Sequence, residues 1–420
     1  LFTHRIEGVK EGEMIQEFEV NDVIADTLSA VDAWEEVLAY ARKPEASIIV
    51  SNTTEIGIQY KADQLTASPP ETYPAKLTAF LHERFLHLPD SETVVLPTEL
   101  LEDNGEKVKE IVLKHARDHK LGEAFLQWLA EKVCFCCTLV DRIVTGMPPQ
   151  EKFVTLSEEL GYRDELLTVS EPYYLWAIQG PQHLSSILSF TQGDSQVMLT
   201  EDITPYRERK LRILNGAHTI SVALGHIYGL TYIHECLNDS LMGAFFERVI
   251  KQEIVPSLPN DIEGGDLFAE EVLDRFRNPF LNHKLLDITL QYTSKMEARN
   301  VPTFLRYMEK EGKVPSLMLL GFAAYLHWIR QLRQTDKGYE GEWQGNPYQV
   351  YDSKAGWWVE TWKKLGGKEV EAWLPYLLQQ ESLWGNNLHQ IPGFSDQIAA
   401  YYTSILEAGS RQTLEVALEC

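Results

Sequence analysis

The first half of the chain alternates short apolar runs, rich in β-branched residues, with longer segments whose apolar residues recur at helical spacing. The candidate strands are residues 47–51, 93–96, 173–178 and 196–199. The candidate helices are residues 30–41, 74–86 and 105–119. Alternation of this kind favours an α/β domain built on a largely parallel sheet.

From about residue 204 the strand signals fade and amphipathic helical patterns dominate, at 237–253, 269–277, 315–332 and 396–407. The segment 338–347 is polar and rich in glycine, which predicts an exposed loop. A chain of 420 residues exceeds one ordinary core. We therefore predict an α/β domain over residues 1–203 and an all-α domain over residues 204–420.

Composition narrows the class of protein. A hydrophobic content of 44% with 24% charged residues is typical of globular proteins, and no apolar run approaches the length of a membrane span. There is no basic-then-apolar leader, so we expect a cytoplasmic location. The net charge of -24 argues against nucleic acid and anionic membranes as partners. A small molecule is the expected partner, and the oligomeric state stays open.

The sequence does not predict a metal site. Five cysteines without a secretion signal indicate reduced thiols, and Cys134, Cys136 and Cys137 lack a second Cys or His pair at ligand spacing. We expect them to be small buried hydrophobic residues. His115 and His119 lie four residues apart, but no third ligand is evident, so a solvated helix face is favoured over a metal-dependent hydrolase or isomerase.

One predicted helix concentrates useful chemistry. It follows Thr204-Pro205 and carries Lys210, Asn215 and His218. At about 100° per residue, His218 lies near 80° and Asn215 near 140° from Lys210, so all three can face one cleft. A lysine can exchange a proton with a substrate, and an amide can donate to a developing oxyanion.

Polar residues also follow the predicted strands of the first half. Residues 51–57 are rich in small hydrogen-bonding side chains, which either receive a ligand or cap their own backbone. Asn104-Gly105 fits ordinary turn chemistry. The neighbours Asp141 and Arg142 lie in an apolar run, where an internal ion pair and a catalytic acid are equally good interpretations.

Several segments, in order along nearly the whole chain, together resemble the polyol-specific long-chain dehydrogenase/reductase (mannitol dehydrogenase) family. They are SNTTEIGI (51–58), PPETYPAKLTAFLHERF (69–85), LPTELLEDNG (96–105), FCCTLVDRIVTG (135–146), EPYYLWAIQGP (171–181), KLRILNGAH (210–218) and RFRNPFLNH (275–283). The resemblance implies a Rossmann-like dinucleotide-binding domain, an all-α substrate domain and zinc-independent hydride transfer with NAD. The likeness is strongest to members that act on sugar acids.

The family pattern Lys-x4-Asn-x2-His matches Lys210, Asn215 and His218. The resemblance implies that Lys210 is the general acid/base. It further implies that Asn215 donates to the oxyanion and that His218 orients substrate hydroxyls.

By the same resemblance, Asn104 is a second oxyanion donor and Asp141 a proton-relay partner, while Asn52 and Thr53 lie against the nicotinamide. A sugar acid also needs a cation for its carboxylate. We expect Lys295 in this role, with Arg277 as the next choice; Arg142 and Lys284 are further candidates, although surface charge is the plainer interpretation of Lys284 and Lys295.

The front of the sequence departs from the family. A first strand and a glycine-rich, pyrophosphate-binding turn are absent, so we expect them in a stretch that precedes Leu1.

Three alternatives stay open: another hexuronate or a neutral polyol as substrate, a non-catalytic sugar-acid-binding protein, and the metal-dependent enzyme built on His115 and His119.

Overall fold

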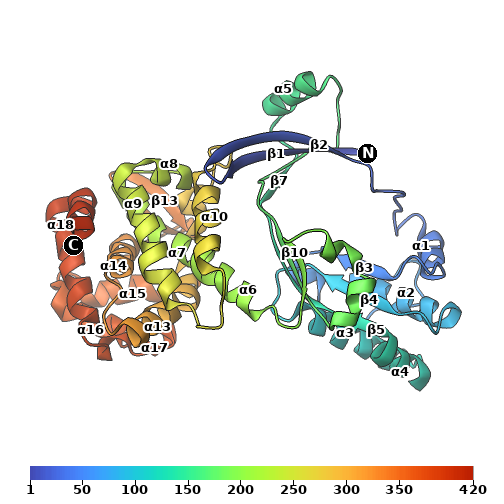
Figure 1. Cartoon of the computed structure of the whole chain (residues 1–420). Helices are drawn as coiled ribbons and strands as arrows, with labels where there is room; N and C mark the ends of the chain where they lie inside the picture. Colours follow the sequence, from blue (N-terminus) through green and yellow to red (C-terminus); the bar gives the residue numbers. More distant parts are fainter. Residues whose placement is uncertain (420) are drawn as a thin grey trace. The chain divides into compact units, whose positions relative to one another are not determined.

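The structure is a computed structural model that describes residues 1–419, apart from the side chain of Glu55 (Figure 1). Its contacts divide the chain into two compact units. The first comprises Leu1–Ile6 and Glu17–Tyr206, and the second comprises Glu7–Gln16 and Arg207–Cys420. Within residues 1–419, no helix is both long and apolar enough to cross a membrane.

A three-stranded parallel sheet forms the centre of the first unit, in the order β3-β4-β5 (Ile48–Ser51, Thr93–Pro97, Val133–Phe135). The helices around it are α1 (Trp34–Ala41), α2 (Tyr73–His87), α3 (Asn104–Asp118) and α4 (Glu123–Lys132). Val94, Val95 and Leu96 are fully buried and belong to two different core clusters. Both faces of this sheet are therefore covered, as expected for parallel strands whose sequence is continuously apolar.

Two further sheets make the first unit mixed rather than largely parallel. One has the order β10-β9-β6 (Val197–Thr200, Leu175–Gln179, Cys137–Asp141), with β10 and β9 parallel and β6 antiparallel. The other has the order β2-β1-β8-β7 (Glu13–Asn21, Phe2–Lys10, Thr168–Ser170, Val144–Gly146), although the end of β1 and the start of β2 fall in the segment Glu7–Gln16 of the second unit. The remaining elements of this part of the chain are helix α5 (Gln150–Leu160) and the 3-10 turns η1 (Glu55–Gly57), η2 (Gln182–Ser186) and η3 (Ser189–Gln192).

The second unit is mostly helical, and its helix α14 (Ser316–Arg330) contacts α7 (Ala217–Tyr228) and α18 (Phe394–Glu419). Every residue from Leu317 to Ile329 is buried, which is the behaviour of a helix that is apolar on all sides. The other α-helices are α6 (Thr204–Arg209), α8 (Ile233–Asn238), α9 (Ser240–Arg248), α10 (Gly265–Arg277), α11 (Leu285–Ile288), α12 (Tyr292–Lys295), α13 (Val301–Glu311), α15 (Ala355–Leu365), α16 (Val370–Leu378) and α17 (Glu381–Trp384). Short 3-10 turns are η6 (Val255–Ser257) and η8 (Leu388–Gln390).

Two predictions for this half were wrong in part. The second unit is not all-α, because β11 (Arg333–Thr335), β12 (Gly338–Trp343) and β13 (Asn346–Val350) form an antiparallel sheet where we expected an exposed loop. Gly341 lies within β12 and is not a turn residue. A Cβ at this position would lie 2.3 Å from the Tyr348 ring, so the glycine is needed to leave room for this aromatic neighbour. Gln344 and Gly345, both at positive φ, form the two-residue hairpin turn.

Candidate active site

Lys210 and Asn215 lie in a π-helix, η4 (Lys210–Gly216), inserted between α6 and α7. A π-helix closes hydrogen bonds between residues five apart, so the residue pair i and i+5 is brought onto one side of the helix. Lys210 and Asn215 are such a pair. The angle of about 140° that a regular α-helix gives them is therefore wrong, and the local structure brings them closer together than the sequence pattern predicted.

Hydrogen bonds to and from a second π-helix, η7 (Met296–Asn300), stabilise this arrangement. Arg212 donates to the carbonyl oxygens of Ala298 and Arg299 at 2.7 and 3.0 Å, and Asn300 donates to the carbonyl oxygen of Gly216 at 3.0 Å. A π-turn interrupts the regular ladder of an α-helix, so buried carbonyls there need other donors. These contacts supply them.

His218 follows in the first turn of α7, three residues after Asn215, and is buried. Its ring stacks on Phe276 with centroids 4.1 Å apart and meets the edge of His283 at 5.2 Å. Burial, followed by the nearby charges of His283, Arg275, Arg299 and Lys295, holds the pKa of His218 well below its usual value. The imidazole is therefore neutral at neutral pH, and its buried Nε2 has no hydrogen-bond partner in the part of the chain that the structure describes.

Two cations near His218 lack an acidic partner among residues 1–419. Lys295 donates to the carbonyl oxygen of Ile288 at 2.9 Å, and Arg299 donates to Oγ1 of Thr219 at 3.1 Å. Burial and the charge of Arg299 lower the pKa of Lys295 to about 8, and burial lowers the pKa of Arg299 to about 10. Half-buried cations without a carboxylate form a site that favours a bound anion.

The other predicted carboxylate ligand, Arg277, is in a different setting. It is 38% exposed at its side chain and pairs with Asp274 at 3.4 Å, so it has the features of a surface charge. Around His218, sequence reasoning missed His283, Arg275 and Arg299. His283 and Arg275 lie in the quoted family segment 275–283, which was the one available signal for them.

In the first unit, the predicted cofactor residues follow the carboxyl end of the parallel sheet. Strands β3 and β4 end in register at Ser51 and Pro97, and exposed Asn52 and Thr53 follow directly. The buried carboxylate of Glu99 accepts hydrogen bonds from Ser51 Oγ at 3.1 Å and from the backbone N–H of Thr53 at 2.8 Å. Glu99, to which sequence analysis gave no role, therefore fixes the shape of this loop.

Asn104 begins α3 and is buried at the same edge. Its amide nitrogen donates to the carbonyl oxygens of Pro97, Glu99 and Thr138 at 3.0 to 3.1 Å, and its Oδ1 accepts from the N–H groups of Gly105 and Thr138, each at 2.9 Å. The side chain thus joins the end of β4 to β6. Because both amide hydrogens are already used, this hydrogen bonding does not favour the oxyanion role that the resemblance implies.

The remaining candidates belong to the first unit. Asp141 is buried at the end of β6, and Arg142 donates to the carbonyl oxygen of Glu171 at 3.2 Å. His115 and His119 lie with ring centroids 6.2 Å apart, and His115 is fully buried, which differs from the solvated face that we expected. No cluster of three or more His, Cys, Asp or Glu side chains suited to a metal ion occurs in residues 1–419.

Comparison with known protein families matches almost the whole chain. Residues 7–190 match the mannitol dehydrogenase Rossmann domain, and residues 202–406 match the mannitol dehydrogenase C-terminal domain. Similar curated proteins include the altronate oxidoreductases of Yersinia enterocolitica (37% identical, over 98% of this chain and 85% of the relative), Pectobacterium carotovorum (39%, 99% and 86%) and Shigella flexneri (36%, 99% and 85%).

Solved structures agree on the fold. The mannitol 2-dehydrogenase of Pseudomonas fluorescens, in complex with NAD and D-mannitol, is 24% identical with a TM-score of 0.62, over 100% of this chain and 83% of that one. A substrate-free D-sorbitol dehydrogenase is 19% identical with a TM-score of 0.74, over 98% and 83%. The Rossmann prediction and the family resemblance are thus confirmed, and the non-catalytic and hydrolytic alternatives lose their support. The chain belongs to the mannitol dehydrogenase family and is an oxidoreductase that acts on CH–OH groups.

Proposed function

We propose that this protein interconverts D-tagaturonate and D-altronate with NAD(H) as cofactor, as a step in hexuronate breakdown. The relatives named altronate oxidoreductase support the substrate pair, and the match to a Rossmann domain supports the dinucleotide. The observation that carries the choice of a sugar acid over a neutral polyol is the half-buried pair Lys295 and Arg299 beside His218.

The charge balance of this pair is the reason. Neither Lys295 nor Arg299 has an ion-pair partner within residues 1–419. Both side chains donate their hydrogen bonds to neutral oxygen atoms. An unpaired cation out of water is costly unless an anion completes its environment. A uronate carboxylate is such an anion, whereas fructose or mannitol has only hydroxyls to offer. Lys295 and Arg299 would therefore distinguish sugar acids from neutral sugars.

The chain's own residues would handle the proton and the oxyanion. In the reducing direction Lys210 would give a proton to the carbonyl oxygen as negative charge develops there, while the amide of Asn215 donates a hydrogen bond to it. The neutral ring of His218 would hold a substrate hydroxyl through its unpartnered Nε2. Asp141 would take part as a proton relay, as the family likeness implies.

The carboxyl edge of the parallel sheet suits a dinucleotide. Ligands of open α/β sheets bind at this edge, and the Glu99 carboxylate holds the loop with Asn52 and Thr53 in a defined shape there. These two side chains would contact the nicotinamide half. When bound, the reduced nicotinamide supplies the hydride that converts the ketone to the alcohol.

Steady-state kinetics with NADH and three ketones test the proposal. D-Tagaturonate should be reduced with a higher kcat/KM than D-fructuronate or D-fructose. Lys295→Met should raise KM for tagaturonate about 10- to 100-fold, because it removes one charged hydrogen bond to the carboxylate. The wild-type KM should also rise as the pH passes about 8, where Lys295 loses its proton, and Lys295→Arg should abolish that rise.

Lys363→Met is the matched control, since Lys363 is an exposed residue that pairs with Glu360 on the surface, and it should leave KM unchanged. A higher kcat/KM for fructuronate or fructose would contradict the proposed substrate. An unchanged tagaturonate KM in Lys295→Met would contradict the carboxylate role and leave the dehydrogenase assignment standing.

A further inference from the structure

Two cysteines of the first unit lie together on one face of the sheet. Cys134 is in β5 and Cys136 follows it, and their Sγ atoms are 3.6 Å apart. Alternate residues of an extended strand point to the same side, and the intervening Phe135 packs into the core on the opposite face. Both thiols are free, and nothing in the oxidoreductase chemistry described above uses them.

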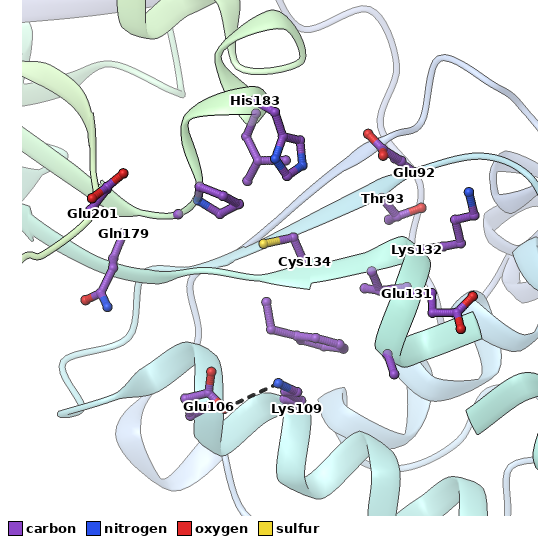
Figure 2. A pocket seen from close by; sticks show the side chains of 16 residues that line it. Glu92, Thr93, Glu106, Lys109, Glu131, Lys132, Cys134, Gln179, His183 and Glu201 are labelled. Atoms are coloured by element: carbon purple, nitrogen blue, oxygen red, sulfur yellow. Dashed lines mark ion pairs between the residues drawn. The ribbon is translucent and has the colours of Figure 1, made fainter. Parts of the chain in front are cut away.

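The two thiols differ in access. Cys136 is buried against Gly180, where an added Cβ would lie 3.2 Å from the sulfur. Cys134 is partly exposed and lines a cavity of about 590 Å³, whose other polar lining residues include Lys109, Gln179 and His183 (Figure 2). A small reagent in this cavity can therefore reach Cys134, while Cys136 lies behind it.

The electrostatics favour Cys134 as the reactive member of the pair. The hydrogen bond from Cys136 is the largest influence on the Cys134 thiol and, together with the charge of Lys109, lowers its pKa to about 7. Burial and the charges of Glu106 and Glu92 act in the opposite direction and are outweighed. The same contact and burial raise the pKa of Cys136, which keeps its proton and acts as the donor. A thiolate is the nucleophilic form of cysteine.

We propose that Cys134 and Cys136 form a reversible redox site that reacts with hydroperoxides. The Cys134 thiolate attacks one oxygen of the peroxide, the O–O bond breaks, and the second oxygen leaves as water or an alcohol, which produces a sulfenic acid. The Cys136 sulfur then attacks the Cys134 sulfur, a water is released and a disulfide forms. With hydrogen peroxide, two thiols are oxidised to one disulfide and the peroxide is reduced to two waters.

The strand geometry makes this disulfide easy to reduce. Two residues along a strand span roughly 6.6 Å, near the upper end of the Cα separation that a disulfide bridges. The backbone cannot shorten freely, because a Cβ on Gly105 would lie 2.5 Å from the carbonyl carbon of Cys136, so the start of α3 is packed directly against it. A strained disulfide is readily reduced by other thiols, which is the property of a reversible site.

Peptide mapping of the full chain after peroxide treatment and thiol blocking tests the site. The wild type should contain a Cys134–Cys136 disulfide that millimolar reduced glutathione converts back to two thiols. Before oxidation, alkylation of Cys134 should titrate with a midpoint near pH 7 and proceed more than about a hundredfold faster than that of buried Cys236.

Variants separate the two roles. Cys136→Ser should stop at a sulfenic acid on Cys134 that dimedone traps, whereas Cys134→Ser should leave Cys136 reduced. Cys137→Ser is the control, and it should form the disulfide as the wild type does. Persistence of both thiols in peroxide, a Cys134–Cys137 bond in place of the Cys134–Cys136 bond, or a disulfide that glutathione does not reduce would each overturn the proposal.

Discussion

At the scale of single residues, Lys210 carries the strongest expectation. It begins the π-helix that also holds Asn215, and it is the group of this helix that can transfer a proton. Lys210→Ala should lower kcat by about 10²- to 10⁴-fold, because general acid–base catalysis is typically worth that much. NADH binding, followed by the quenching of protein fluorescence, should be almost unchanged.

A matched control is Lys363→Ala, an exposed lysine of α15 whose ion pair with Glu360 lies on the surface. It should leave kcat within twofold of wild type, roughly the scatter expected of surface changes. A loss below tenfold in Lys210→Ala would rule out the acid/base assignment.

At the scale of elements, the pairing of π-helix η4 with π-helix η7 positions the site. Asn300 of η7 is fully buried, and its amide nitrogen donates to the carbonyl oxygen of Gly216 at the end of η4. Asn300→Ala leaves that carbonyl without this donor, so we expect a loss of about 1 to 3 kcal/mol in the free energy of unfolding. Because Asn215 precedes Gly216, kcat should fall as well.

Urea unfolding and steady-state kinetics on the same preparations measure both effects. Asn386→Ala makes the same substitution at an exposed position and should change neither quantity. A variant Asn300→Ala that loses stability but keeps full kcat would show that the π-helix does not depend on this contact for its shape.

At the scale of the whole molecule, buried titrating groups limit stability on both sides of neutral pH. Burial lowers the pKa values of His226 and His327 to about 4, so their contribution is present above about 6.5 and is lost as the pH falls towards 4. Burial raises the pKa of Glu253 to about 7, although its carboxylate accepts from the N–H groups of Leu317 and Met318. The contribution of Glu253 is therefore present below about 4.5 and is lost as the pH rises through 7.

The comparison of wild type with Glu253→Gln isolates the second effect. Between pH 5 and pH 8 the free energy of unfolding of the wild type should fall relative to the variant by an amount on the order of 2 kcal/mol. Urea unfolding followed by tryptophan fluorescence measures this difference. A difference that does not change between the two pH values would contradict the raised pKa of Glu253.

Local patterns were sufficient where local energetics decide the structure. The strands at 48–51, 93–97, 175–179 and 197–200 and the helices α2 and α3 were predicted to within a few residues, because their apolar spacing is strong. Helix α1 begins at Trp34 rather than residue 30, and β1 and β2 were missed altogether. Long-range pairing forms these last elements: β1 lies parallel to β8, about 160 residues further along the chain.

The candidate active site also depends partly on local sequence and partly on long-range contacts. By itself the sequence determined that Lys210, Asn215 and His218 share a helical segment, and the likeness of the quoted segments determined the family, because both depend only on residue identity and spacing. Only the tertiary structure decided that Lys210 and Asn215 lie in a π-helix, since the side chains that donate to the carbonyl oxygens of Asn215 and Gly216 belong to Arg299 and Asn300, 84 positions away. Tertiary packing also decided which cations matter: burial without an acidic partner sets Lys295 and Arg299 apart from Arg277, and burial is a property that no single stretch of sequence contains.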